Sequence, residues 1–149
     1  MRRTPRNFSP LKQKGAAAIE FALVFVVFFA VFYGLVTYSL PLLMMQSFNN
    51  AAAEAVRQSV AISPSAANYQ TLVPNQAKAA LASQLNWVPS FNVASDTTVS
   101  FDGKLLRVLI SYPKTKLTQI LPVLTLPGIG DVPNLPTYLS AEASLQLAP

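Results

Sequence analysis

Residues 21–45 read FALVFVVFFAVFYGLVTYSLPLLMM, a run of 25 side chains without a charge. At a rise of about 1.5 Å per residue, this run makes roughly 37 Å of helix, whereas the hydrocarbon core of a bilayer is about 30 Å thick. A helix buried in a globular protein is usually shorter and carries a polar face. The run therefore predicts a transmembrane helix, which we place at about residues 18–45.

The segment before the run is basic and sets the predicted orientation. Five basic residues and no acidic residue precede Gly15: Arg2, Arg3, Arg6, Lys12 and Lys14. After the run, Arg57 is the only basic residue within about 20 positions. The positive-inside rule therefore predicts a cytoplasmic leader at residues 1–15 and a C-terminal domain on the outer side. A cleaved secretory signal is the alternative, but its apolar region would be only about 7–15 residues long.

Beyond the apolar run, the helix is expected to continue as an amphipathic segment. Apolar residues recur on one helical face: Phe48, Ala52, Ala55, Val56 and Val60. Glu54 and Arg57 stand three positions apart, a spacing that supports a helix slightly. Ser63-Pro64-Ser65 should end the element. The sequence therefore predicts one long helix over residues 16–62, with a kink or a loosened turn at Pro41.

The remaining residues, 63–149, have the pattern of a small mixed domain. Residues 75–86 read as a short helix, and Pro74 suits its first turn. Residues 139–147 alternate apolar and polar side chains, as a half-exposed strand does. A loop rich in proline and glycine precedes that strand. We therefore expect an α+β fold, in which a long N-terminal transmembrane and amphipathic helix carries a small outer domain with an antiparallel β-sheet.

A β-hairpin is predicted at the centre of this domain. Residues 97–101 and 104–112 have the composition of strands, and Asp102-Gly103 between them is typical of a two-residue turn. Such a turn would place Val99 opposite Leu106. One face of the ribbon would then be mainly apolar, as a half-buried antiparallel pair requires.

The composition excludes several classes of function. The chain has no cysteine and no histidine, which removes disulfide frameworks, cysteine nucleophiles and the usual zinc ligands. Six carboxylates are scattered without a close pair that suggests acid/base chemistry: Glu20, Glu54, Asp96, Asp102, Asp131 and Glu142. The net charge of +5 comes from the leader, so a nucleic-acid-binding surface is not expected. We therefore predict a protein that is not an enzyme and that has no catalytic residue, metal or cofactor.

The residues just before the apolar run form a specific pattern. Residues 12–21 read KQKGAAAIEF, in which Gly15 ends a basic leader and Glu20-Phe21 follows after four residues. This pattern resembles the processing site of type IV prepilins. Together with NNAAAEA at residues 49–55, it is similar to the TadE-like family of pseudopilins from tight-adherence pilus systems. The resemblance covers residues 16–58, under a third of the chain.

The resemblance implies a maturation step and a set of partners. A prepilin peptidase would cut between Gly15 and Ala16, because glycine lets a protease approach and extend the backbone. Glu20 and Phe21 would then follow the new amine closely, and Glu20 of one subunit would neutralise the Ala16 amine of a neighbour at membrane depth. The implied partners are the bacterial inner membrane, the prepilin peptidase, other pilin-like subunits and the pilus or secretion machinery. The pilin-like outer domain would lie in the periplasm.

The role within such a system follows from size. Major pilins of tight-adherence systems are much shorter, so a minor or accessory pseudopilin of a Flp-type (type IVb) pilus or a related secretion system fits better. The alternative is an uncleaved single-pass membrane anchor with a periplasmic protein-binding module. Each part of the motif also has a simple structural explanation, since Gly15 can start a helix and Glu20 can be solvated by headgroups.

Overall fold

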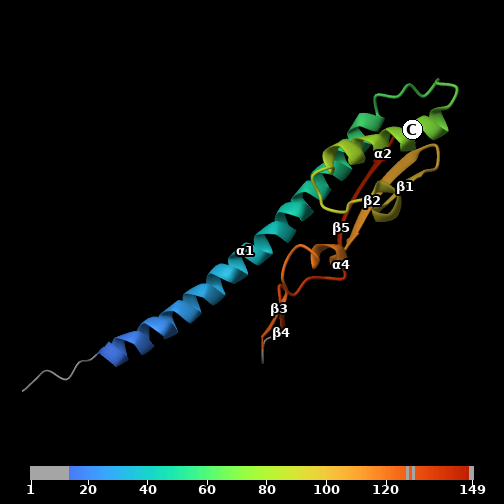
Figure 1. Ribbon diagram of the computed structural model, residues 1–149. Coiled ribbons are helices and arrows are strands. Elements are labelled where there is room, and N and C mark those ends of the chain that lie inside the picture. Colours follow the sequence, from blue (N-terminus) through green and yellow to red (C-terminus); the bar gives the residue numbers. More distant parts are fainter. Residues whose placement is uncertain (1–13, 127, 129, 148–149) are drawn as a thin grey trace, which may run out of the picture. The chain divides into compact units, whose positions relative to one another are not determined.

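The computed structural model describes residues 14–126, 128 and 130–147 (Figure 1). Its elements are α1 (Lys14–Ser59), α2 (Tyr69–Gln84), α3 (Val93–Asp96), β1 (Thr97–Phe101), β2 (Leu105–Pro113), α4 (Lys114–Leu117), β3 (Leu124–Leu126), β4 (Gly130–Val132) and β5 (Tyr138–Gln146). The predicted α+β class is confirmed, with a long N-terminal apolar helix followed by a small antiparallel sheet. Of the predicted leader, only the last two residues fall within the described part.

The chain divides into two compact units between Leu35 and Val36. In the first unit the described residues belong to α1, and residues 15–32 are all exposed. Extensive apolar surface of this kind is unfavourable in water. Among the described residues, α1 is the one helix long and apolar enough to cross a membrane. The chain therefore has the form of a single-pass membrane protein.

The second unit packs the last turns of α1, together with α2, against one face of a three-stranded sheet. The strand order is β1-β2-β5, and both pairings are antiparallel. Because successive side chains of a strand point to opposite faces, the central strand β2 buries every second residue: Leu106, Val108, Ile110 and Tyr112. α1 supplies the other side of this core: Met44, Phe48, Ala51, Ala52, Ala55 and Val56. At the centre of this core, the ring centroids of Phe48 and Tyr112 lie 5.8 Å apart.

The predicted long helix ends three residues early, at Ser59 rather than Ile62. Hydrogen bonds of the 3₁₀ type continue the turn, the last of them from the Ile62 N–H to the Ser59 carbonyl at 3.3 Å. The chain therefore leaves the helix gradually. Pro41 lies inside α1 with its ring buried, and the kink predicted there stays a prediction.

The predicted start of α2 is wrong. The helix begins at Tyr69 rather than Asn75, so Pro74 lies inside it. Tyr69 packs its ring 5.5 Å from that of Phe101, and Val73 is fully buried. Pro74 removes one hydrogen bond from the helix, but these tertiary contacts stabilise the extra turns. The sequence alone does not show those contacts, so Pro74 by itself predicts a later start of the helix.

The predicted hairpin forms, but its register is wrong by two residues. Val99 pairs with Val108, and Leu106 pairs with Phe101. The loop is therefore longer, and the Asp102 carboxylate stabilises it by accepting hydrogen bonds from the N–H groups of Lys104 and Leu105 at 2.8 and 2.7 Å. A slip of two residues keeps every side chain on its original face, so the predicted apolar face is right.

The predicted terminal strand is confirmed as β5, which lies beside β2 along its whole length. Within the predicted proline- and glycine-rich loop, β3 and β4 pair as a separate two-stranded sheet. Figure 1 shows this small hairpin projecting away from the three-stranded sheet. The second unit thus consists of a packed core and one protruding arm.

Candidate functional site

The predicted processing site lies at the N-terminal end of the described part of α1. Gly15 and Ala16 are the second and third described residues of the helix, and both are exposed. A Cβ added at Gly15 would meet nothing within 4 Å, and glycine costs a helix about 1 kcal/mol relative to alanine. Packing among the described residues therefore does not require glycine here.

Glu20 and Phe21 lie about one turn further along α1. Both side chains are exposed, Phe21 to 70%. The spacing of four residues puts Glu20 on the same side of the helix as Ala16. No salt bridge within the described part of the chain involves Glu20. A carboxylate at membrane depth is costly without a partner, so Glu20 is the group of this segment that gains most from a cation on another molecule.

Aromatic rings line the apolar part of α1, a feature that the sequence analysis did not identify. Phe21, Phe25, Phe29 and Tyr33 stack in succession, with ring centroids 6.1, 6.2 and 6.3 Å apart. Phe28 and Phe32 form a further stacked pair at 6.1 Å. The four-residue spacing of these aromatics is the signal that would have disclosed the stacking. We call these six side chains the aromatic ridge.

The other carboxylates each have a partner of their own. Glu54 pairs with Arg57 at 2.7 Å, Asp96 with Lys116 at 2.6 Å, Glu142 with Arg107 at 3.0 Å, Asp131 with the Thr125 hydroxyl at 2.7 Å, and Asp102 with two backbone N–H groups. Hydrogen bonds from Arg57 and then from Gln58 hold the pKa of Glu54 below its usual value. Within the described residues, no group of three carboxylate, histidine or cysteine side chains could hold a metal ion.

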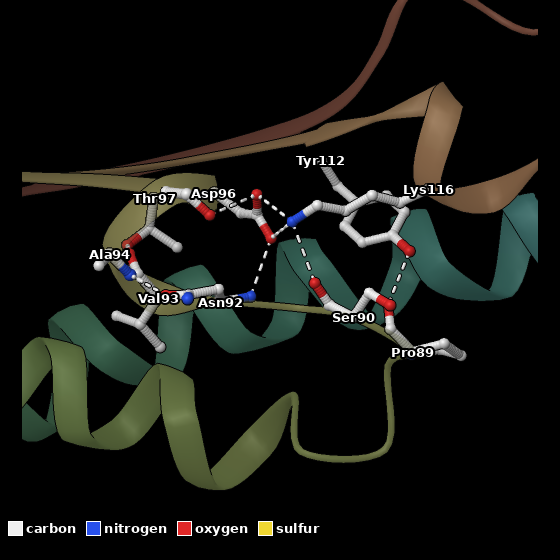
Figure 2. Close-up of polar contacts among 10 residues, drawn as sticks. Pro89, Ser90, Asn92, Val93, Ala94, Asp96, Thr97, Tyr112 and Lys116 are labelled. Atoms are coloured by element: carbon white, nitrogen blue, oxygen red, sulfur yellow. Dashed lines mark hydrogen bonds and ion pairs between the residues drawn. The ribbon is translucent and has the colours of Figure 1, made fainter. Parts of the chain in front are cut away.

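Asp96 is the buried member of this set and is only 3% exposed. Figure 2 shows the polar contacts of its carboxylate. Lys116 Nζ lies 2.7 and 2.6 Å from its two oxygens. The backbone N–H of Asn92 donates to Oδ2 at 2.8 Å, and the Ser95 hydroxyl donates to Oδ1 at 3.1 Å. These donors compensate the cost of removing the carboxylate from water.

Lys116 and Tyr112 complete this cluster. Lys116 Nζ also donates to the carbonyl of Ser90 at 3.0 Å and lies 5.7 Å from the centre of the Tyr112 ring. Ser90 has a φ of 55°, a left-handed conformation, in the loop before α3. The Tyr112 hydroxyl donates to the Pro89 carbonyl at 2.7 Å. Burial, and to a lesser degree the Asp96 carboxylate, raise the pKa of Tyr112. Because these groups satisfy one another, the cluster ties the loop before α3 to β2 and α4, and we call it the Asp96 clamp.

The helix that carries the predicted processing residues matches a known family. Residues 15–57 match the TadE-like protein family. The TadE-like segment begins at Gly15, includes Ala16, Glu20 and Phe21, and ends two residues before the end of α1. The resemblance predicted from the sequence is thereby confirmed over this segment, which is less than a third of the 149 residues. No curated protein and no solved structure matches the chain.

Proposed function

We propose that this protein is a minor, pseudopilin-like subunit in the assembly of a tight-adherence (Flp-type) pilus or a related secretion system. The observation that carries the proposal is the TadE-like match, because it includes the predicted processing residues Gly15 and Ala16 as well as the membrane-length run. The role is structural rather than enzymatic. The apolar part of α1 packs beside other pilin-like helices in the bacterial inner membrane, and the outer domain, residues 63–149, contacts partners in the periplasm.

Maturation follows from the position of Gly15. A prepilin peptidase needs an extended backbone at the bond that it cuts, and Gly15 lies immediately before that bond. Glycine weakens the helix there and leaves the backbone accessible. Cleavage after Gly15 removes the basic leader and leaves a positive amine on Ala16. That amine lies one turn from Glu20, so in a packed array each Glu20 has the amine of a neighbouring subunit as a partner.

The decisive test of maturation is the N-terminus of the protein purified from its native membrane, read by mass spectrometry. The wild type should begin at Ala16, and Gly15→Arg should retain the leader. Lys14→Gln is the matched control, because it changes the adjacent residue and leaves four basic residues in the leader. A Gly15→Arg variant that is cut like the wild type would contradict the proposal. An intact leader in the wild type would favour the uncleaved anchor with a protein-binding module.

The role of Glu20 is tested separately from cleavage. Glu20→Gln should still be cut but should be recovered in smaller amounts with other pilin-like subunits after cross-linking in the membrane. Glu54→Gln is the control, because it makes the same change in the same helix at a carboxylate that already pairs with Arg57. Equal recovery of both variants would show that Glu20 does not mediate subunit contacts.

A further inference from the structure

The protruding arm has a composition that is unusual for the surface of a water-exposed domain. We define the β3–β4 arm as residues 120–126 and 130–135. Asp131 is the only charged residue between Lys116 and Glu142 in the sequence, and its carboxylate is occupied by the Thr125 hydroxyl at 2.7 Å. Exposed apolar side chains lie along the arm: Ile120 at 43%, Val123 at 36% and Leu124 at 40%. Exposed apolar side chains that lie together on a surface mark a site of contact with a membrane or with another protein.

The arm is fixed to α1 at a defined position. The backbone N–H of Asn134 donates to the Tyr38 hydroxyl at 2.9 Å. Close to this contact, Pro133 of the arm is buried, and so are Thr37 and Pro41 of α1. The base of the arm is closed by a hydrogen bond from the Lys114 N–H to the Thr137 carbonyl at 2.9 Å. The arm therefore belongs to the packed unit and is held beside Tyr38.

Tyr38 lies inside the uncharged run of residues 21–45. Spanning a hydrocarbon core of about 30 Å takes about 20 helical residues. Counted from Phe21, which follows the charge of Glu20, the span ends at about Leu40. Tyr38 then lies at the outer edge of the hydrocarbon, the depth at which tyrosine is enriched in membrane proteins. Asn134, whose backbone N–H is hydrogen-bonded to the Tyr38 hydroxyl, then lies at the level of the lipid headgroups.

We propose that the β3–β4 arm lies in the outer interface of the bilayer that α1 spans, with Ile120, Val123 and Leu124 in contact with lipid. The protein then contacts the membrane twice, once through a spanning helix and once through an interfacial hairpin. The arm suits this depth because its exposed residues include Ile120, Val123 and Leu124, and its one charge is hydrogen-bonded to Thr125. The proposal rests on the membrane span of α1 and not on cleavage at Gly15, so the two succeed or fail independently.

The absence of cysteine in the chain makes the test direct, because one introduced cysteine gives one labelled position. Val123→Cys and Leu124→Cys of the full-length protein are labelled with a nitrobenzoxadiazole dye and inserted into phosphatidylcholine–phosphatidylglycerol vesicles. Some vesicles contain lipids with a nitroxide near the headgroup. Ser144→Cys is the matched control, because Ser144 is exposed on β5 at the hairpin end of the sheet, where it pairs with Arg107.

Dye at positions 123 and 124 should emit at shorter wavelength than dye at position 144. The nitroxide lipids should also quench the dye at 123 and 124 roughly threefold more, since an interfacial segment lies about 5–10 Å into the headgroup boundary. Equal emission and quenching at the three positions would overturn the proposal. A blue shift without lipid quenching, lost when the protein is diluted with excess lipid, would also overturn it, because a neighbouring subunit would then cover the arm. Two label positions guard against local disruption by either substitution.

Discussion

Replacing Lys116 with methionine should destabilise the second unit more than replacing its partner Asp96 with asparagine. Breaking a buried ion pair by removing one partner costs about 3–5 kcal/mol, because the other charge stays buried. Asp96 is 3% exposed and cannot reach water, but it keeps its hydrogen bonds from Asn92 and Ser95. We therefore expect the lower end of that range, about 3 kcal/mol, for Lys116→Met.

The reverse substitution leaves a charge that can be hydrated. The Lys116 side chain is 24% exposed, and its amine keeps the Ser90 carbonyl as an acceptor. The asparagine of Asp96→Asn can still accept the hydrogen bond from Asn92. We expect this variant to lose about 1–2 kcal/mol, the value of a hydrogen bond with one charged partner. In the double variant no carboxylate is stranded, so it should be about 1 kcal/mol more stable than Lys116→Met alone.

Urea unfolding of the full-length protein in detergent micelles measures these differences. The fluorescence of Trp87, the single tryptophan, reports on the loop that the Asp96 clamp holds. The four proteins form a double-mutant cycle, from which the coupling between the two side chains is obtained. The reasoning is refuted if Asp96→Asn proves more costly than Lys116→Met, or if Lys116→Met unfolds at the same urea concentration as the wild type.

Three further outcomes are expected. Phe48→Ala should lower the unfolding free energy by about 3–5 kcal/mol in the same urea assay, since it empties the centre of the core; a loss below 1 kcal/mol would mean that the core refills the space. The raised pKa of Tyr112 means that the folded protein retains a proton that the unfolded chain loses, so stability should fall as the pH rises above about 10, and less so in Tyr112→Phe; equal pH profiles would contradict this. Gly103→Ala should cost about 1–2 kcal/mol, because Gly103 has a φ of 95°, a backbone conformation that residues with a Cβ rarely adopt. Gly34→Ala should not lower the stability, because a Cβ added there would meet nothing within 4 Å and alanine favours a helix by about 1 kcal/mol over glycine.

Local signals allowed much of this fold to be predicted. An uncharged run of 25 residues identifies α1 by length alone, and strict alternation identifies β5. The motif from Gly15 to Phe21 is also local, and the family match covers it. The alternation of β2 likewise predicted the buried face correctly, because a slip of two residues does not exchange the faces.

The missed features depend on contacts between distant residues. The early start of α2 depends on Tyr69 packing against Phe101. Asp96 and Lys116 are 20 positions apart, and the four-residue helices α3 and α4 bring them together. The second compact unit begins at Val36, within α1. Its core needs Met44 and Phe48 from α1, and no periodicity in residues 63–149 discloses that need.

The strand order has a consequence for how the protein is made. β2 is the central strand, and its second partner, β5, follows only after residues 114–137. The ribosome therefore delivers the first hairpin well before the strand that completes the sheet. A lone two-stranded hairpin is only marginally stable, so Leu106, Val108 and Ile110 stay uncovered during that interval, when they are open to misassociation. A chain that stops short of β5 should be a substrate for chaperones and proteases rather than a shortened but folded subunit.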